Sequence, residues 1–299
     1  MKKLLLASMV TCCAPNAFAD FIGVHGSISG WQSTFSGKIA GTKKLAERER
    51  YGWGVPSFDE RGFDEEQQLF GYIAFEHPVP LLPNVRLGFS KIEDSGTSLD
   101  YIDTRRLDRG IINGEQIYTV LAQNVYTELN IDALDLTLYY EVLDNWVNLD
   151  LGLTVRQMTG EFYETTFEEY LPESELGNTC ANLDFPSGVI TPGGPRVCEI
   201  PPLASTTDID FIVPMLFAEV RFDLPLSGFF IGGRGHAIAY SSNKVLDLEV
   251  EAGYMFDFTV MEFGAALGYR TSSLKADDLE GLYSDATLDG YYGSLKVHF

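Results

Sequence analysis

The last ten residues of the chain, 290–299, alternate between apolar and polar side chains along the whole segment. One alternate set is apolar apart from one small glycine: Tyr291, Gly293, Leu295, Val297 and Phe299. Period-two alternation predicts a β-strand with two different faces, and about ten residues are enough for a tilted strand to cross a bilayer. This ending therefore predicts a β protein, either a soluble sheet with this strand at its edge or a barrel in a membrane.

Residues 1–19 predict an export signal. Two early lysines are followed by a short apolar core at 4–10, and residues 17–19 read Ala-Phe-Ala, which is a small-residue cleavage site. The apolar core is too short to serve as a transmembrane helix. We expect a cleaved signal peptide at 1–19 and a single mature domain at 20–299.

In an exported chain, a final strand that ends on an aromatic residue has a more specific meaning. It resembles the C-terminal signal that outer-membrane β-barrel proteins present to their assembly machinery. The resemblance implies periplasmic chaperones and the barrel-assembly machinery as partners, and the bacterial outer membrane as the location. The residues that would form this assembly signal are Tyr291, Leu295, Val297 and Phe299.

Cleavage of the leader removes Cys12 and Cys13 and leaves two cysteines, Cys180 and Cys198. Two cysteines in an exported chain predict one disulfide, because the periplasm is oxidising. The bond would close a loop around a Pro/Gly-rich stretch, 184–195. Metal binding by this pair is disfavoured because no histidine lies nearby in the sequence.

The charge of the chain excludes one class of partner. The net charge is −22, and loss of the two leader lysines makes it −24. Such an acidic chain is a poor partner for nucleic acid. It suits a surface beside anionic lipopolysaccharide with divalent cations between them. No later stretch has 18 consecutive apolar residues, so the mature chain can cross a membrane only as a closed barrel, which satisfies every backbone group.

The alternation repeats often enough to predict an all-β fold, a transmembrane antiparallel up-and-down β-barrel of about ten strands. An even number places both termini in the periplasm, with short turns there and long extracellular loops. The long loops are expected at 34–68, 93–126, 157–207 and 271–289. Eight or twelve strands also remain open because 117–128, where an extra hairpin is one option, is hard to place. The expected strands are 21–33, 69–77, 85–92, 134–142, 147–155, 209–224, 229–240, 248–256, 263–269 and 290–299.

Two internal motifs add a resemblance to a family. The turn at 76–84 reads EHPVPLLPN and the stretch at 144–152 reads DNWVNLDLG. Together with Phe299, these motifs resemble a family of uncharacterised proteobacterial outer-membrane β-barrel proteins. The resemblance implies the fold and the location, and it brings no activity or catalytic residue.

Several charged side chains fall on the predicted inner faces of the strands. Barrels of about eight strands are filled by side chains, whereas those of sixteen or more hold an aqueous channel. At ten strands, the inner charges either pair and plug the lumen or line a narrow pore that prefers cations. We favour the plug and a monomeric protein with a structural or surface-interaction role. The predicted lumen charges are Glu219, Arg221, Asp223, Arg234, His236, Glu249, Glu251, Glu262 and Arg270.

An enzyme is the second alternative. The predicted size matches the omptin surface proteases, which would need a histidine with acidic partners near the outer rim. Of four histidines, His236 alone is predicted in the outer half of the barrel, where Asp210 or Asp247 would approach it. A lipid-modifying enzyme would need a similar cluster. The sequence has no phosphate-binding loop, nucleophile elbow or zinc signature, so we expect no catalysis and no cofactor.

The charged loops suggest two further partners. The acids Asp277, Asp278, Glu280 and Asp285 offer oxygen ligands for divalent cations, although they lack EF-hand spacing. The basic block at 38–50 offers cations to lipopolysaccharide phosphates. A solvated surface is the simpler explanation of both.

Overall fold

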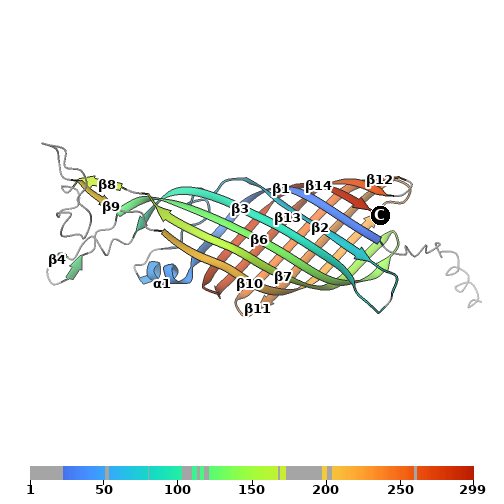
Figure 1. Ribbon diagram of the computed structural model, residues 1–299, viewed down its shortest axis with the longest axis horizontal. Helices are drawn as coiled ribbons and strands as arrows, with labels where there is room; N and C mark the ends of the chain where they lie inside the picture. Colours follow the sequence, from blue (N-terminus) through green and yellow to red (C-terminus); the bar gives the residue numbers. More distant parts are fainter. Residues whose placement is uncertain are drawn as a thin grey trace, which may run out of the picture.

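The structure, a computed structural model, describes residues 23–50, 54–79, 81–102, 110–112, 115–117, 121–167, 169–172, 197–200, 204–258 and 261–299. Ten antiparallel strands form one closed barrel in the order β1-β14-β13-β12-β11-β10-β7-β6-β3-β2 (Figure 1). The predicted ten-stranded up-and-down barrel is therefore confirmed. Its strands are β1 (Gly23–Gly41), β2 (Glu66–Glu76), β3 (Asn84–Ile102), β6 (Leu121–Asp144), β7 (Val147–Thr166), β10 (Ala204–Asp223), β11 (Phe229–Tyr240), β12 (Asn243–Asp257), β13 (Glu262–Leu279) and β14 (Leu282–His298).

Smaller elements lie outside the barrel wall. A short helix, α1 (Thr42–Arg50), follows β1. Two two-stranded sheets lie within the long connections, and they consist of β4 (Gly110–Ile112) with β5 (Glu115–Ile117), and β8 (Glu169–Pro172) with β9 (Val197–Ile200). In the part of the chain that the structure describes, no helix has the length and apolar character needed to span a membrane.

The first and last strands close the barrel. Their register runs from His25 opposite His298 to Gly41 opposite Leu282, and the Phe299 N–H donates to the Val24 carbonyl oxygen at 3.0 Å. Following the register around the barrel from Val24 leads back to β1 at Ser36, twelve residues further on. Such a stagger accompanies strongly tilted strands, which Figure 1 shows.

The two ends of the barrel differ in their connections. The terminal end holds Gly23, Phe299 and four short turns, which join β2 to β3, β6 to β7, β10 to β11 and β12 to β13. The loop end holds α1 and the other connections. The sequence-based expectation of short turns on one side is confirmed.

The strands extend much further toward the loop end than the sequence predicted. Most of the expected loop at 271–289 is strand, with a tight turn at Glu280–Gly281 between β13 and β14. The expected loop at 93–126 loses its two ends to β3 and β6, and the loop at 157–207 loses its start and its last residues to β7 and β10. The expected loop at 34–68 likewise begins as β1 and ends as β2. The extra hairpin considered near 117–122 is instead the pair β4 and β5.

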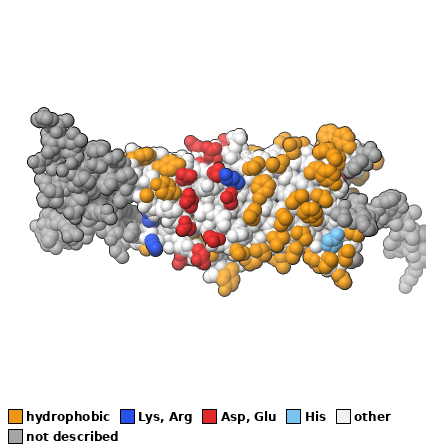
Figure 2. Space-filling model, viewed as in Figure 1, with side chains coloured by type: hydrophobic (Ala, Val, Ile, Leu, Met, Phe, Trp, Pro, Cys, Tyr) orange, Lys and Arg blue, Asp and Glu red, His pale blue; other side chains and the backbone are white. Residues whose placement is uncertain are grey.

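The polarity of the wall inverts along each long strand, as β6 shows most clearly. Near the terminal end, Leu134, Leu136 and Leu138 point outward and are exposed, whereas Asp135 and Thr137 point inward. Toward the loop end the apolar side chains point inward, and the acids point outward. In Figure 2, hydrophobic side chains accordingly cover the terminal-end half of the wall, which we call the apolar belt, and Asp and Glu form a band beside it. The inward, buried residues of β6 beyond the belt are apolar except for one threonine: Val125, Thr127, Leu129, Ile131 and Ala133.

The interior beyond the belt is an apolar core. Strand β10 contributes Ile209, Phe211 and Val213 to it, and β1 contributes Phe35 and Ile39. The sequence predicted a polar lumen throughout, so this half of the interior differs from the expectation. A sheet with water on its outer face buries its apolar face toward the interior, and the exposed acids on the outer face here fit that arrangement.

Candidate functional site

The interior of the barrel within the apolar belt contains a network of ion pairs. Its centre is Asp247, whose carboxylate is 1% exposed. Asp247 accepts hydrogen bonds from Arg156 at 2.8 Å and from Arg270 at 2.8 and 3.0 Å. Arg156 also makes a two-pronged contact with Asp135, at 2.7 Å for each bond. Paired, planar contacts of this kind are the strong form of the guanidinium–carboxylate interaction.

A second branch of the network lies nearer the terminal end. Arg234 donates to Glu249 at 2.5 Å and lies 3.9 Å from Glu219, which also accepts from Arg86. Lys296 pairs with Glu251 at 2.6 Å. With the first branch, this gives five cations and five carboxylates, so the network is neutral. The ten side chains are Arg86, Arg156, Arg234, Arg270, Lys296, Asp135, Glu219, Asp247, Glu249 and Glu251.

Aromatic rings fill the space between these charges. The Arg270 guanidinium lies 4.4 Å from the ring centroid of Phe70 and 4.7 Å from that of Trp31. Arg86 and Arg234 lie 4.4 and 4.6 Å from the ring of Tyr72. Such cation–π contacts partly replace lost hydration, so the arginines are held without bulk water.

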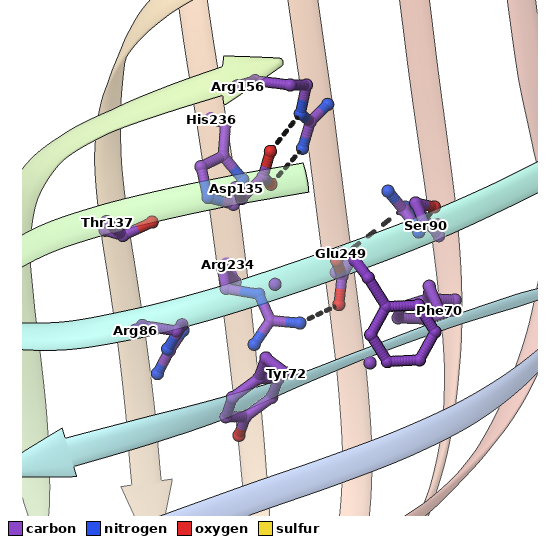
Figure 3. A pocket seen from close by; sticks show the side chains of 14 residues that line it. Phe70, Tyr72, Arg86, Ser90, Asp135, Thr137, Arg156, Arg234, His236 and Glu249 are labelled. Carbon is purple, nitrogen blue, oxygen red and sulfur yellow. Dashed lines mark hydrogen bonds and ion pairs between the residues drawn. The ribbon is translucent and has the colours of Figure 1, made fainter. Parts of the chain in front are cut away.

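A cavity of about 30 Å³ remains inside the network, next to Gly88 (Figure 3). Figure 3 shows arginines and His236 around it, and the Nε of Arg86 is buried without a hydrogen-bond partner in the described part of the chain. A polar cavity of more than about 10–15 Å³ holds a water molecule. The cavity is therefore large enough for one or two waters and too small for a peptide or a lipid chain.

His236 faces this closed interior. Its side chain is 6% exposed, its ring lies 5.1 Å from that of Phe217, and its register partner on β12 is Asp247. Asp247 therefore approaches His236, as the sequence allowed, but its oxygens are bound by two arginines. Asp210 is on the outer, exposed face of β10, so its proposed approach to His236 is wrong. The histidine does not lie at an open rim where a large substrate could reach it.

A capping segment, residues 54–63, closes the loop end. Phe58 is fully buried and stacks on Phe35, with ring centroids 4.7 Å apart. Arg61 enters the barrel and donates to Glu164, to Thr127 at 3.3 Å and to the Ile39 carbonyl at 3.1 Å. These contacts fix the segment across the apolar core.

Two carboxyl groups near the cap lie beyond the apolar belt and have shifted pKa values. Burial acts to raise the pKa of Glu164, but the charges of Arg61 and Lys44 outweigh it and hold this pKa below its ordinary value. Burial raises the pKa of Asp94 to about 6, and the negative charges of Glu66 and Asp64 add to the effect. Asp94 is 6% exposed, and its Oδ2 has no hydrogen-bond partner within the described chain.

No family model and no curated protein matches the chain. Among solved structures, the outer membrane protease OmpT from Escherichia coli is 13% identical, with 93% of this chain and 96% of that chain covered and a TM-score of 0.45. The P. putida toluene transporter TodX is 8% identical (93% and 89% covered, TM-score 0.25), and Pseudomonas aeruginosa OpdQ is 10% identical (92% and 97% covered, TM-score 0.11). At these values the likenesses carry no argument about function. The resemblance to a proteobacterial barrel family stays a prediction.

The other predicted lumen charges lie at the terminal end. Arg221 pairs with Asp223 at 2.7 Å, and His298 Nδ1 lies 3.0 Å from Glu262 Oε2. His298 stacks on its register partner His25, with ring centroids 4.1 Å apart. His25, His298 and Glu262 lie at the closing seam of β1 and β14, whereas Arg221 and Asp223 lie on β10, across the barrel from the seam.

Five members of the central network are not among the predicted lumen charges, and one of them, Asp247, was considered only as a partner of His236. The five are Arg86, Asp135, Arg156, Asp247 and Lys296. Each lies at an inward position of a strand whose alternation was visible in the sequence. Arg86 and Glu219 are 133 residues apart and meet across the barrel. The alternation of inward and outward positions along a strand identifies such inward residues, but it does not identify their partners.

The remaining predictions concern the assembly signal, the disulfide and metal binding. Tyr291 and Leu295 point outward from β14 and are exposed, and Phe299 completes the seam, but their role as an assembly signal stays a prediction. Cys180 lies outside the described residues, so the disulfide to Cys198 also stays a prediction. Across the described residues, no three His, Cys, Asp or Glu side chains are placed to hold a metal ion.

Proposed function

We propose that this protein is a monomeric integral outer-membrane β-barrel with a plugged lumen and a structural or surface-interaction role. Its terminal end faces the periplasm, and its loop end projects from the cell. The apolar belt supports the membrane location, because it leaves large side chains such as Leu153 (62% exposed), Leu216 (65%) and Leu267 (76%) uncovered around the wall. Contiguous exposed apolar surface of this kind marks an interaction site, and on a barrel wall the fitting partner is lipid.

The observation that supports a plugged lumen is the order of the layers that fill the barrel from one end to the other. A neutral ion-pair network fills the belt region, an apolar core lies beyond it, and the capping segment covers that core. An ion that moved through would have to break buried pairs and then cross the apolar core without water. Both steps are costly, so the proposal disfavours the narrow cation pore.

The outer surface beyond the belt supports a proposal about partners. Asp132, Glu161, Asp208 and Asp210 point outward and are exposed there. In the proposed orientation they lie level with the headgroups of the outer leaflet. We expect divalent cations to link this acidic surface to lipopolysaccharide phosphates, and the connections beyond it to be free for surface contacts.

Conductance in planar bilayers tests the plugged lumen. The purified full-length chain should give no steady single-channel current, and flotation of the same preparation with lipid vesicles shows that it has inserted. A steady current from inserted protein would overturn the proposal in favour of the pore. If the protein fails to float with vesicles, the membrane location itself is refuted.

A further inference from the structure

The terminal end of the barrel exposes a large apolar side chain at each of its four short turns and at the end of the chain. The four short turns expose Leu81 (88%), Trp146 (67%), Leu226 (fully) and Phe258 (61%), and the chain end exposes Phe299 (52%). Polar side chains usually occupy exposed turn tips in water. Five apolar tips at one end therefore indicate that these connections do not face bulk water.

Leu226 gives the sharpest form of this argument. Its backbone has a φ of 62°, in the left-handed region that glycine and asparagine adopt far more readily than leucine. The turn thus carries a conformational cost at the same residue whose side chain is completely exposed. In water a polar residue such as asparagine would adopt this φ at a lower cost and would also suit an exposed position better. An apolar environment around the tip would offset the cost of leucine.

The distribution of the tips around the rim identifies the partner. In the barrel order, the connections lie between β12 and β13, β10 and β11, β6 and β7, and β2 and β3, with Phe299 beside the seam of β1 and β14. They therefore alternate evenly around the whole circumference. A protein docked on this end would meet one side of it, whereas a planar lipid interface meets every tip.

The tips are also continuous with the apolar belt. Leu224 and Phe229 flank the turn of Leu226, and Phe256 and Phe263 flank that of Phe258, and all four are exposed. Figure 2 shows hydrophobic side chains extending to this end of the wall. Tryptophan and tyrosine favour the boundary between acyl chains and headgroups, where one part of the ring is apolar and the other is hydrated.

We propose that the four short turns and the chain end insert into the boundary between headgroups and acyl chains of the phospholipid leaflet that they face. The inference rests on the proposed membrane location and adds to it a position along the membrane normal. The turns then lie within the headgroup region of one leaflet. The long part of the barrel with a polar outer surface projects only from the opposite side of the membrane.

Trp146 is a natural reporter of this insertion. The chain has three tryptophans, and the ring of Trp31 is buried in the interior. Subtracting the fluorescence of Trp146→Phe from that of the parent isolates the Trp146 signal in phosphatidylethanolamine–phosphatidylglycerol vesicles. We expect quenching by phospholipids brominated near the headgroup end of the acyl chain, and protection from aqueous iodide on both sides of the vesicle.

A second reporter separates this inference from the membrane location. Leu267→Trp, made in the Trp146→Phe background, places an indole in the middle of the belt. If this indole is quenched by brominated lipid while Trp146 is quenched by iodide, the barrel is inserted and the turns are in water, which overturns the inference. If neither indole responds to brominated lipid, both the membrane location and the inference fail.

Substitution of Leu226 supplies a second test, because the expected change in stability has opposite signs for a turn in water and a turn in the leaflet boundary. Leu226→Asn relieves the left-handed strain, so it should stabilise the barrel if the tip lies in water. In the leaflet boundary, loss of the leucine contact should instead lower the folding equilibrium constant in vesicles severalfold. Leu99→Asn, at an exposed site (70%) beyond the belt, is the matched control and should leave that constant unchanged. A gain in stability for Leu226→Asn would refute insertion.

Discussion

Replacement of Asp247 by Asn tests whether the central network holds the barrel together. The change keeps the size of the side chain and removes the charge that faces Arg156 and Arg270. Removing one partner of a buried ion pair costs about 3–5 kcal/mol. Both arginines keep another contact, because Arg156 still binds Asp135 and Arg270 still binds Ser90 at 3.1 Å. We therefore expect the lower end of this range, about 3 kcal/mol of unfolding free energy.

Urea unfolding from lipid vesicles, extrapolated to zero denaturant, measures this free energy. Asp210→Asn is the matched control, because Asp210 lies on the exposed outer face and should change stability by less than about 0.5 kcal/mol. The double variant Asp247→Asn with Arg270→Met removes one charge of each sign. Because it leaves the network neutral, its loss of stability should be smaller than the sum of the two single losses.

Two results would refute this reasoning. If Asp247→Asn costs no more than Asp210→Asn, the network does not contribute to stability in the way its geometry indicates. If the double variant is additive, the two charges do not interact and the ion pair is not formed in the membrane-bound protein. In either case the lumen would be hydrated, and the conductance of the variant should then be measured beside that of the parent.

Three further changes have defined outcomes. Phe58→Ala removes a fully buried ring from the cap and should cost about 3–5 kcal/mol of unfolding free energy, with faster proteolysis of residues 54–63 as a second readout. Asp94 has a folded pKa of about 6, above its unfolded value of about 3.9, so stability should fall as pH rises from about 4 to about 6, and Asp94→Asn should abolish this dependence in a pH series of urea unfolding. For His236→Ala, protease and acyl-transfer assays should show no activity in parent or variant. Activity that the parent has and the variant lacks would establish the enzyme alternative.

The sequence predicted the barrel but not the full length of its strands. Alternation at 134–142 and 147–155 stands out because an apolar outer set faces a polar inner set. Beyond residue 134, toward the loop end, the inner set becomes apolar and Asp132 appears on the outer face. Read with one fixed orientation, such a stretch looks like the start of a charged loop. The strand prediction stopped at the point where the polarity of the wall inverts.

The interior was predictable in kind but not in detail. The alternation along the strands placed Arg234 and Glu249 on inner faces, and the structure shows them paired on neighbouring strands. The cap was not predictable, because Phe58 and Arg61 lie in a polar segment without periodicity. Their contacts with Phe35 and Glu164 depend on a closed barrel that already exists.

The inversion of polarity also bears on function, because it connects the position of the membrane with the closure of the lumen. In the apolar belt, which the proposal places in lipid, the apolar side chains point outward and the interior is filled by charged groups that pair with one another. Beyond the belt, which the proposal places in water, the same strands turn their apolar residues inward and form an apolar core. A pore would need polar inner faces along the whole strand. On β6 the inner residues Leu129 and Ile131 break that requirement where the outer Asp132 marks the edge of the belt. The change of polarity along the strands thus supports the proposal that the lumen is plugged.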